Sequence, residues 1–274
     1  MFRLTILLAG AVALCGMPRA HGQDKSTGDA DLDRIVRLLK NNDLRIRKAA
    51  ADELGKRGDA AKAAARPLCN TIFDPSPIVA KAALQAFDRV QPDLSKTVAK
   101  LVLEGYPATD AKAGEQAKGI EELGDMQQKA VPAIDVLLLW LKKGDRGDNS
   151  SAALQISKAC LAAIKKIKID DDEVIKAFKT LVLSKTAQAA VRVEILNDLD
   201  EWAGTDQAKK KQVVPILKSG LNDTALQLAS VKILSRYGPL AKETIPTLKK
   251  LKLSKNQEVR DAAEEALQQF DKGK

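Results

Sequence analysis

Side chains that carry out chemistry are scarce in this 274-residue sequence. It contains a single histidine, His21, which lies in an N-terminal segment that we expect to be removed. A chain without histidine cannot form a Ser-His-Asp or Cys-His catalytic arrangement, or a zinc site that uses histidine. Neither a phosphate-binding loop of the Gly-x-x-x-x-Gly-Lys-Ser/Thr type nor a dinucleotide-binding fingerprint occurs. The sequence therefore predicts no catalytic residues, no metal site and no cofactor, which favours a protein that is not an enzyme.

Acidic residues cluster at two places where their oxygen atoms could bind calcium. The run Asp170–Glu173 lacks the rest of any calcium-binding loop, and acidic residues interact favourably with the dipole at the start of a helix. We therefore interpret this run as a helix start. Asp145, Asp148 and Asn149 form a weaker example in a polar loop. The same loop contains the adhesion tripeptide Arg146–Asp148. Three residues often occur by chance, so we interpret the tripeptide as part of a loop rich in glycine and aspartate.

Lysine is concentrated near the C-terminus. Residues 205–274 contain 14 basic and 8 acidic residues, whereas the whole chain has 45 basic and 36 acidic ones. A basic surface attracts anionic lipid, polysaccharide or nucleic acid, but aromatic residues for stacking on bases are few there. A solvated outer face is the favoured interpretation, an anionic surface is the second, and nucleic acid is disfavoured. The lysines that define this group are Lys209, Lys210, Lys211, Lys218, Lys249, Lys250 and Lys252.

The first 22 residues have the pattern of a secretory signal peptide. Arg3 precedes the apolar run Leu4–Leu14, and Ala20–Gly22 supplies small residues before a cleavage position. The run is too short for a normal membrane helix, and no other stretch reaches the ~18 apolar residues that one needs. We therefore expect export to the periplasm, the envelope or the extracellular space, with no membrane span in the mature chain. An uncleaved anchor is less favoured, and so is a lipoprotein, because a leucine rather than a small residue precedes Cys15.

A helical motif recurs seven times, and its clearest copies are Ile46–Gly55 and Val259–Leu267. Each copy closes on a large apolar residue, and the steps between closing residues are 33, 36, 41, 35, 35 and 33. A period of this size is typical of stacked helix pairs, in which a helix A, a turn and a helix B form each repeat. The sequence predicts an all-α fold, a right-handed α-solenoid of about seven helix pairs without a β-sheet. The closing residues are Leu54, Phe87, Leu123, Ile164, Leu199, Leu234 and Leu267.

The predicted organisation divides the chain into four parts. A signal peptide (1–22) precedes a flexible mature N-terminus (23–30), the repeat domain (31–270) and a short tail (271–274). In the first repeat, we expect Asp43 to cap helix B and Gly58 to end it. The seven repeats are expected at approximately 31–58, 59–91, 92–125, 126–168, 169–204, 205–238 and 239–270.

Cysteine, alanine, glycine and proline occur at positions that agree with the predicted helix pairs. Cys69 and Cys160 fall at apolar helical positions in the second and fourth repeats, which do not touch in a solenoid, so we expect both to be buried and unpaired. Alanine and glycine at matching helix B positions should let neighbouring helices approach closely. A proline in helix A removes one hydrogen bond and is expected to bend the helix. Such prolines are Pro67, Pro132, Pro215 and Pro246.

The repeat combines a proline in helix A, an Asp-Pro or Asn-Asp turn and a helix B of the form Val-Arg-x-Ala-Ala-x-x-Ala-Leu. In these features it resembles the HEAT repeat, most closely the short bacterial HEAT-like form found in phycobilin lyases, over Asp31–Phe270. The resemblance implies a ladder in which a turn aspartate pairs with an arginine early in helix B. That arginine is present as Arg47, Arg192 and Arg260. The expected ladder is incomplete, because the aligned positions elsewhere are Ala80, Gln116, Ser157 and Gln227.

Stacked repeats form a long surface that suits an extended partner. The leading hypothesis is an exported, non-enzymatic scaffold that binds another protein through a concave surface formed by the B helices. Two alternatives stay open: an enzyme or enzyme subunit, as in the HEAT-like lyases and glycosylases, and a structural component of an envelope assembly. Trp140 is expected in the core, and Trp202 is expected to be partly exposed, as at a contact surface. The candidate partner-binding residues are Arg47, Glu53, Lys81, Gln85, Lys158, Arg192, Asp198, Lys232 and Arg236.

Overall fold

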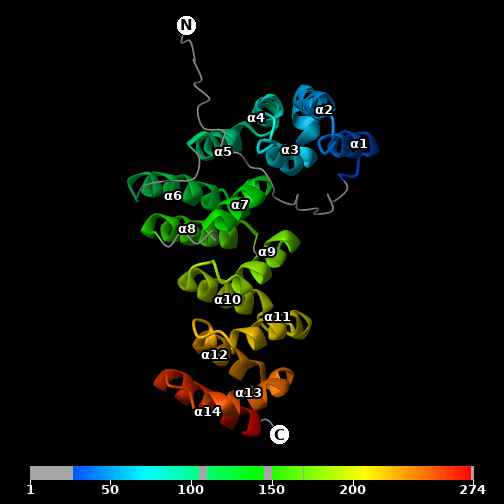
Figure 1. Cartoon of the computed structure of the whole chain (residues 1–274). Helices are drawn as coiled ribbons and strands as arrows, with labels where there is room; N and C mark the ends of the chain where they lie inside the picture. Colours follow the sequence, from blue (N-terminus) through cyan, green and yellow to red (C-terminus); the bar gives the residue numbers. More distant parts are fainter. Residues whose placement is uncertain (1–26, 105–109, 145–149, 169, 273–274) are drawn as a thin grey trace. The chain divides into compact units, whose positions relative to one another are not determined.

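The computed structural model describes residues 27–104, 110–144, 150–168 and 170–272 (Figure 1). Every regular element in these ranges is a helix, which confirms the predicted all-α class. None of the helices in these ranges is long and apolar enough to cross a membrane. The predicted signal peptide and the loop that contains Arg146–Asp148 lie outside the described residues. The chain divides into two compact units, an N-terminal unit (Met1–Gln91) and a C-terminal unit (Pro92–Lys274).

Two helix pairs make up the described part of the N-terminal unit. The A helices and B helices have apolar residues at helical spacing on the faces that meet, and α2 packs along α4. Leu54 of α2 and Phe87 of α4, two of the predicted closing residues, are fully buried between the helices. The first pair is α1 (Ala30–Leu38) and α2 (Leu44–Arg57), and the second is η1 (Gly58–Ala64), α3 (Ala65–Thr71) and α4 (Pro77–Val90).

Five helix pairs follow one another in the described part of the C-terminal unit (Figure 1). Their B helices are α6, α8, α10, α12 and α14, and each packs on the next one in the series. Trp140 and Phe178 of the A helices are buried, and Trp140 is a core residue as predicted. The elements are α5 (Pro92–Glu104), α6 (Asp110–Asp125), η2 (Gln127–Ala133), α7 (Ile134–Gly144), α8 (Ser151–Lys168), α9 (Asp172–Leu183), α10 (Ala189–Ala203), α11 (Gln207–Gly220), α12 (Gln227–Tyr237), η3 (Gly238–Thr244), α13 (Ile245–Leu251) and α14 (Gln257–Lys272).

Helix A changes type along its length in three helix pairs, one in the N-terminal unit and two in the C-terminal unit. The 3-10 helices η1, η2 and η3 lead directly into α3, α7 and α13. Pro132 lies within η2, and Pro67 and Pro246 lie in the first turns of α3 and α13. Because proline lacks the N–H that an α-helix needs, each of these helices becomes α-helical only near its proline. The sequence predicted a bend at each proline. Pro67, Pro132 and Pro246 instead mark a change of helix type. At the fourth proline, Pro215, α11 continues as an α-helix.

Aspartate and glycine set the helix ends where the sequence predicts them. Asp43 caps α2 by accepting a hydrogen bond from the N–H of Arg45, and Gly58 follows the helix with a φ of 51°. Glycine adopts this left-handed conformation without a steric cost, so the chain turns there into η1. Asp171 caps α9 by accepting a hydrogen bond from the N–H of Glu173. The acidic run therefore lies at a helix start, as predicted.

Small residues let the B helices approach closely. A Cβ atom added to Gly55 of α2 would lie 2.9 Å from the Cα and Cβ atoms of Ala86 on α4. A Cβ atom added to Gly124 of α6 would lie 3.0 Å from the Cα atom of Ala163 on α8. These distances are shorter than ordinary contacts between carbon atoms, which are about 3.5–4.0 Å apart. The predicted close approach at alanine and glycine is thus confirmed at both contacts.

Both described cysteines are buried and neither is in a disulfide, as predicted. Cys69 lies in α3 and Cys160 in α8, and each is fully buried. Burial raises the pKa of the Cys160 thiol, which keeps it protonated and unreactive. They act as small apolar residues of the core.

We predict that Gly55→Ala destabilises the protein by about 1–3 kcal/mol, because its new methyl group meets the backbone of α4. Gly114→Ala is the matched control, since the nearest atom to its added Cβ is Gln155 Nε2 at 3.9 Å. This second change should stabilise α6 by roughly 0.5–1 kcal/mol through its effect on helix propensity. Urea unfolding followed by circular dichroism measures both. Equal effects of the two variants would contradict the close approach at Gly55.

Candidate interaction surface

The nine candidate partner-binding residues lie on B helices, but three of them are buried. Arg47, Arg192 and Asp198 are 6%, 5% and 3% exposed. A side chain that is buried within the fold offers a partner little surface, so the structure places these three residues at helix junctions rather than on an exposed face. Of the other six, Glu53 is half-buried and the rest are exposed: Lys81, Gln85, Lys158, Lys232 and Arg236.

Arg47 joins the first helix pair to the second. Its Nε and Nη2 atoms donate hydrogen bonds to the two carboxylate oxygens of Asp74 at 2.7 and 3.0 Å. Its Nη1 atom donates to the backbone carbonyls of Asn41 and Asn42 at 2.8 and 3.0 Å. Asp74 lies in the turn before α4 and also accepts a hydrogen bond from the N–H of Ser76. A bidentate pair with further hydrogen bonds satisfies both buried charges, so Arg47 serves the stacking of the repeats.

Arg192 makes the corresponding connection in the C-terminal unit. Its Nε atom donates a hydrogen bond to the carbonyl of Val182 at 2.7 Å, and its Nη2 atom donates to Asp223 at 2.6 Å. Asp223 lies ahead of α12, in the next helix pair, and the bond from Arg192 holds the pKa of Asp223 below its usual value. The aspartate–arginine ladder that the resemblance implies is thus present at Arg47 and at Arg192.

The ladder is incomplete at other positions, as the sequence predicts. Arg260 in the last helix pair donates hydrogen bonds to the backbone carbonyls of Ser254 at 2.6 Å and Lys255 at 3.1 Å and to the side-chain oxygen of Gln257, and it pairs with no aspartate among the described residues. Gln227 donates to the carbonyl of Leu221 at 3.1 Å, which keeps the contact with the turn but supplies no charge. Ser157 is buried at the aligned position of α8. The arginine–aspartate pair therefore joins particular neighbouring repeats and is not present in every repeat.

Asp198 belongs to a charged cluster between α8 and α10. Lys165 of α8 pairs with Asp198 at 3.0 Å and with Glu201 at 2.7 Å. Burial raises the pKa of Asp198, and the hydrogen bond from Lys165 opposes this change. Burial also raises the pKa of Glu194, with a further contribution from the charge of Asp198. Ionisation of Glu194 therefore costs more free energy in the folded chain than in the unfolded chain.

Charge alternates along the B helices of the C-terminal unit. The helices α6, α10 and α14 are mostly acidic, whereas α8 and α12 have only basic charged residues. Ion pairs cross from one helix to the next, from Asp125 to Lys166 at 2.8 Å and from Asp200 to Arg236. Opposite charges on neighbouring helices attract each other, although each exposed pair contributes only about 0–1 kcal/mol. Arg236 is therefore already engaged with α10.

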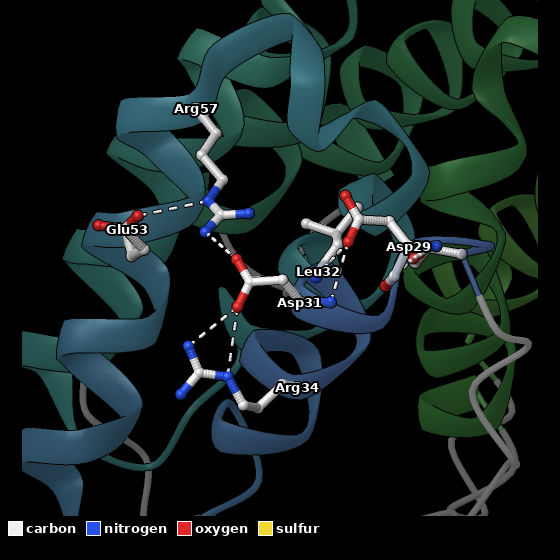
Figure 2. A network of polar contacts seen from close by, with 7 residues as sticks. Asp29, Asp31, Leu32, Arg34, Glu53 and Arg57 are labelled. Atoms are coloured by element: carbon white, nitrogen blue, oxygen red, sulfur yellow. Dashed lines mark hydrogen bonds and ion pairs between the residues drawn. The ribbon is translucent and has the colours of Figure 1, made fainter.

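The first helix pair carries a separate charged network, which Figure 2 shows. Asp31 of α1 accepts hydrogen bonds from Arg57 of α2 and from Arg34 on its own helix. These bonds hold the pKa of Asp31 below its usual value. Arg57 also pairs with Glu53 at 3.3 Å. Glu53 thus contributes to a network that joins α1 to α2.

Four of the nine candidates are exposed and form no ion pair within the part of the chain that the structure describes. Lys81 and Gln85 lie one turn apart on α4 of the N-terminal unit. Lys158 lies on α8 and Lys232 on α12 of the C-terminal unit. We call these four the free B-helix residues, since binding a partner through them would break no ion pair within the described part of the chain.

The sequence analysis did not identify a groove beside Trp202 in the C-terminal unit. The groove is open to solvent, has a volume of about 410 Å³ and lies between α9, the end of α10 and α11. The ammonium groups of Lys209 and Lys179 lie 4.9 and 5.9 Å from the centre of the Trp202 ring. Contacts of this kind contribute about 0.5–1 kcal/mol at exposed sites. Trp202 is half-buried, in agreement with the predicted partial exposure. The groove is lined by Asp172, Ile175, Lys176, Lys179, Thr180, Trp202 and Gln212, and Lys209 lies beside this lining, against the ring.

No family model matches the sequence, and no curated protein matches it. Similar solved structures are repeat designs and engineered proteins. An engineered protein from the Northeast Structural Genomics Consortium is 21% identical, with 88% of this chain and 68% of that chain covered and a TM-score of 0.39. A designed armadillo repeat protein is 20% identical, with 87% and 99% covered and a TM-score of 0.34. A second engineered protein from the same consortium is 20% identical, with 89% and 98% covered and a TM-score of 0.25.

The structure itself defines the class of protein. In each unit, helix pairs follow one another along the chain, B helix packs on B helix, and each pair contacts its neighbours in sequence. This is the architecture of stacked helical repeats. The chain is therefore an α-helical repeat protein.

We predict that Arg47→Ala costs about 3–5 kcal/mol, because it leaves the carboxylate of Asp74 buried without its partner. Arg260→Ala is the matched control: this arginine occupies the same place in its repeat but pairs with no aspartate of a following repeat, so the loss should be about 1 kcal/mol. Urea unfolding measured by circular dichroism distinguishes the two. A smaller loss for Arg47→Ala than for Arg260→Ala would show that the ladder does not stabilise the stack.

We predict that Glu194→Gln stabilises the protein at pH 7 and has no effect near pH 4. A carboxyl group with a raised pKa binds its proton more tightly in the folded chain, so its ionisation destabilises the fold. The penalty is absent below the pKa of the unfolded chain, about 4.3, and complete above the folded pKa. Solvent screening keeps the gain below ~1 kcal/mol, because Glu194 is only partly buried. Thermal unfolding at the two pH values measures it.

Glu201→Gln is the control for this effect. Glu201 is exposed and accepts a hydrogen bond from Lys165, so removing its charge should bring no gain in stability at pH 7. A gain for Glu194→Gln that is equally large at both pH values would contradict the assignment to ionisation.

Proposed function

We propose that this protein is a non-enzymatic scaffold that binds another protein through its B helices. The observation that carries the proposal is the set of exposed polar side chains, the free B-helix residues, on a helical repeat fold. Helical repeats commonly bind extended partners along their surface, and each of the two units supplies its own exposed residues for this purpose. The absence of histidine after His21 supports a role in binding rather than in catalysis by a histidine-dependent mechanism.

Electrostatics favours the free B-helix residues over the other polar residues of the same helices. Arg236, Lys165 and Lys166 already pair with carboxylates of neighbouring helices, so a partner would have to compete with these bonds. Lys158 and Lys232 carry positive charges that no ion pair within the described residues neutralises. A partner with acidic residues would complement them and associate faster at low ionic strength.

We further propose that the protein acts outside the cytoplasm. The support is the sequence pattern of residues 1–22, with its basic start, apolar run and small residues before Gln23. Partners would then be found in the envelope or outside the cell, so an envelope fraction is the appropriate source for a capture experiment. A structural role in a larger envelope assembly would use the same surface.

A comparison of two multiple variants tests the B-helix surface. Tagged protein that lacks residues 1–22 captures partners from an envelope fraction, mass spectrometry identifies them, and biolayer interferometry then gives the affinity of the purified partner. We expect the combined variant Lys81→Ala, Gln85→Ala, Lys158→Ala and Lys232→Ala to weaken binding at least about tenfold, because contacts at several positions are lost together.

The control variant removes three lysines from A helices: Lys211→Ala, Lys249→Ala and Lys250→Ala. These side chains are exposed, and the variant loses as many positive charges as the B-helix variant does. Its affinity for the partner should match that of the unchanged protein. If both variants bound the partner as the unchanged protein does, the B-helix proposal would be lost.

A further inference from the structure

We propose that the groove beside Trp202 is a second binding site, which takes an acidic protein segment with an apolar side chain at its centre. The groove lies on α9, α11 and the end of α10, whereas the free B-helix residues lie on α4, α8 and α12. The two proposals therefore concern different residues and can fail independently.

The floor of the groove suits an apolar side chain. Ile175 of α9 is buried, and Trp202 lies at the end of α10, half-buried, so that part of its ring is open to solvent. Tryptophan that is partly exposed in a recess is typical of binding hot spots, because a partner can remove a large area from water there. Trp202 is the one tryptophan available for this purpose among the described residues, since Trp140 is 1% exposed.

The rim of the groove is cationic. Lys179 donates a hydrogen bond to the side-chain oxygen of Gln212 at 2.9 Å, and Lys209 donates to the backbone carbonyl of Trp202 at 3.5 Å. Both acceptors are neutral, so they hold the lysines near the ring without cancelling their charge. Lys176 adds a third cation and is exposed, whereas Lys179 and Lys209 are half-buried. Within the described residues, none of these three lysines pairs with a carboxylate, and Asp172 is the acidic residue that lines the groove.

Beside the groove, α11 adds positive charge, whereas α9 has Asp172 and Glu173 as well as Lys176 and Lys179. α11 contributes four lysines and no acidic residue, and α13 contributes two more lysines. A segment rich in carboxylates is therefore drawn to this side of the unit and can exchange the neutral acceptors of Lys179 and Lys209 for charged ones. An apolar residue between the carboxylates would meet Ile175 and the exposed part of Trp202.

The aromatic content favours a protein segment over single-stranded nucleic acid. Nucleic acid without sequence preference binds on successive aromatic rings, one base on each. The other ring close to a lysine in this region is that of Tyr237, 5.1 Å from the ammonium group of Lys210, and it is 4% exposed. One accessible ring offers a single stacking position, which is too few for successive bases. A single apolar side chain of a peptide needs only one ring to contact.

Fluorescence anisotropy of a labelled peptide tests the proposal on the chain that lacks residues 1–22. The probe has leucine and phenylalanine between runs of glutamate, and the control probe has glutamine in place of every glutamate. We expect the acidic probe to bind, to bind more weakly as salt is added, and to change the fluorescence of Trp202. The fluorescence change should vanish in Trp202→Phe.

A pair of charge-matched variants locates the site. Lys179→Gln with Lys209→Gln should weaken binding of the acidic probe about 3- to 30-fold, since two exposed ion pairs are lost. Lys249→Gln with Lys250→Gln removes the same charge from α13 and should change the affinity less than twofold. Circular dichroism checks that every variant is folded, and the free B-helix variant should bind the probe normally.

Three results would overturn the proposal. The first is equal weakening by the two lysine pairs, which would mean diffuse attraction to a basic surface. The second is tight binding of the glutamine control probe. The third is displacement of the acidic probe by oligodeoxythymidylate that itself depends on Lys179 and Lys209, which would assign the groove to nucleic acid.

Discussion

Within each of the two units, the packing of one B helix on the next is the constraint on which the structure depends. Gly55 leaves room for the backbone at Ala86, and Gly124 leaves room for Ala163, so neighbouring helices meet nearly backbone to backbone. Helices this close bury large apolar residues such as Leu54 and Phe87 completely, although the chain is only 3% aromatic. A repeat that lacked a neighbour would leave this face exposed, and stability therefore belongs to the series rather than to a single pair.

Close packing also determines what the polar residues of the B helices can do. A guanidinium group at the start of a B helix is buried by the next pair, so Arg47 and Arg192 require aspartates from that pair to balance their charges. Farther along the helices, opposite charges on neighbouring surfaces meet as ion pairs, for example Lys165 with Asp198. Among the nine candidate residues, the four that are exposed and outside such pairs are the ones that support a binding role.

The A helices give a different surface. The helices α11 and α13 contain lysines and no acidic residue, so positive charge accumulates along each of them, and one of these lysines, Lys218, pairs with Glu243. The predicted basic group Lys209–Lys211 belongs to this surface, and Lys209 lies against the ring of Trp202. The structure thus joins two features that the sequence analysis considered separately, the basic C-terminal region and the partly exposed tryptophan. Their meeting point is a groove whose floor is apolar and whose rim is cationic.

The sequence by itself determined the helical class, the helix cap at Asp43, the helix start at Asp170–Glu173, the buried cysteines and the small-residue contacts. These follow from periodicity and local chemistry, which depend on residues close together in the chain. Only the tertiary structure decided which polar residues are free. Arg47, Arg192 and Asp198 have the residue types and spacing of surface contacts, yet burial at helix junctions removes them from the surface. The groove beside Trp202 was likewise beyond sequence reasoning, because Lys179 and Lys209 approach one ring only when α9 and α11 pack on either side of it. Periodicity fixes which side chains share a face of one helix, but distances between helices depend on how the pairs rotate and pack against one another.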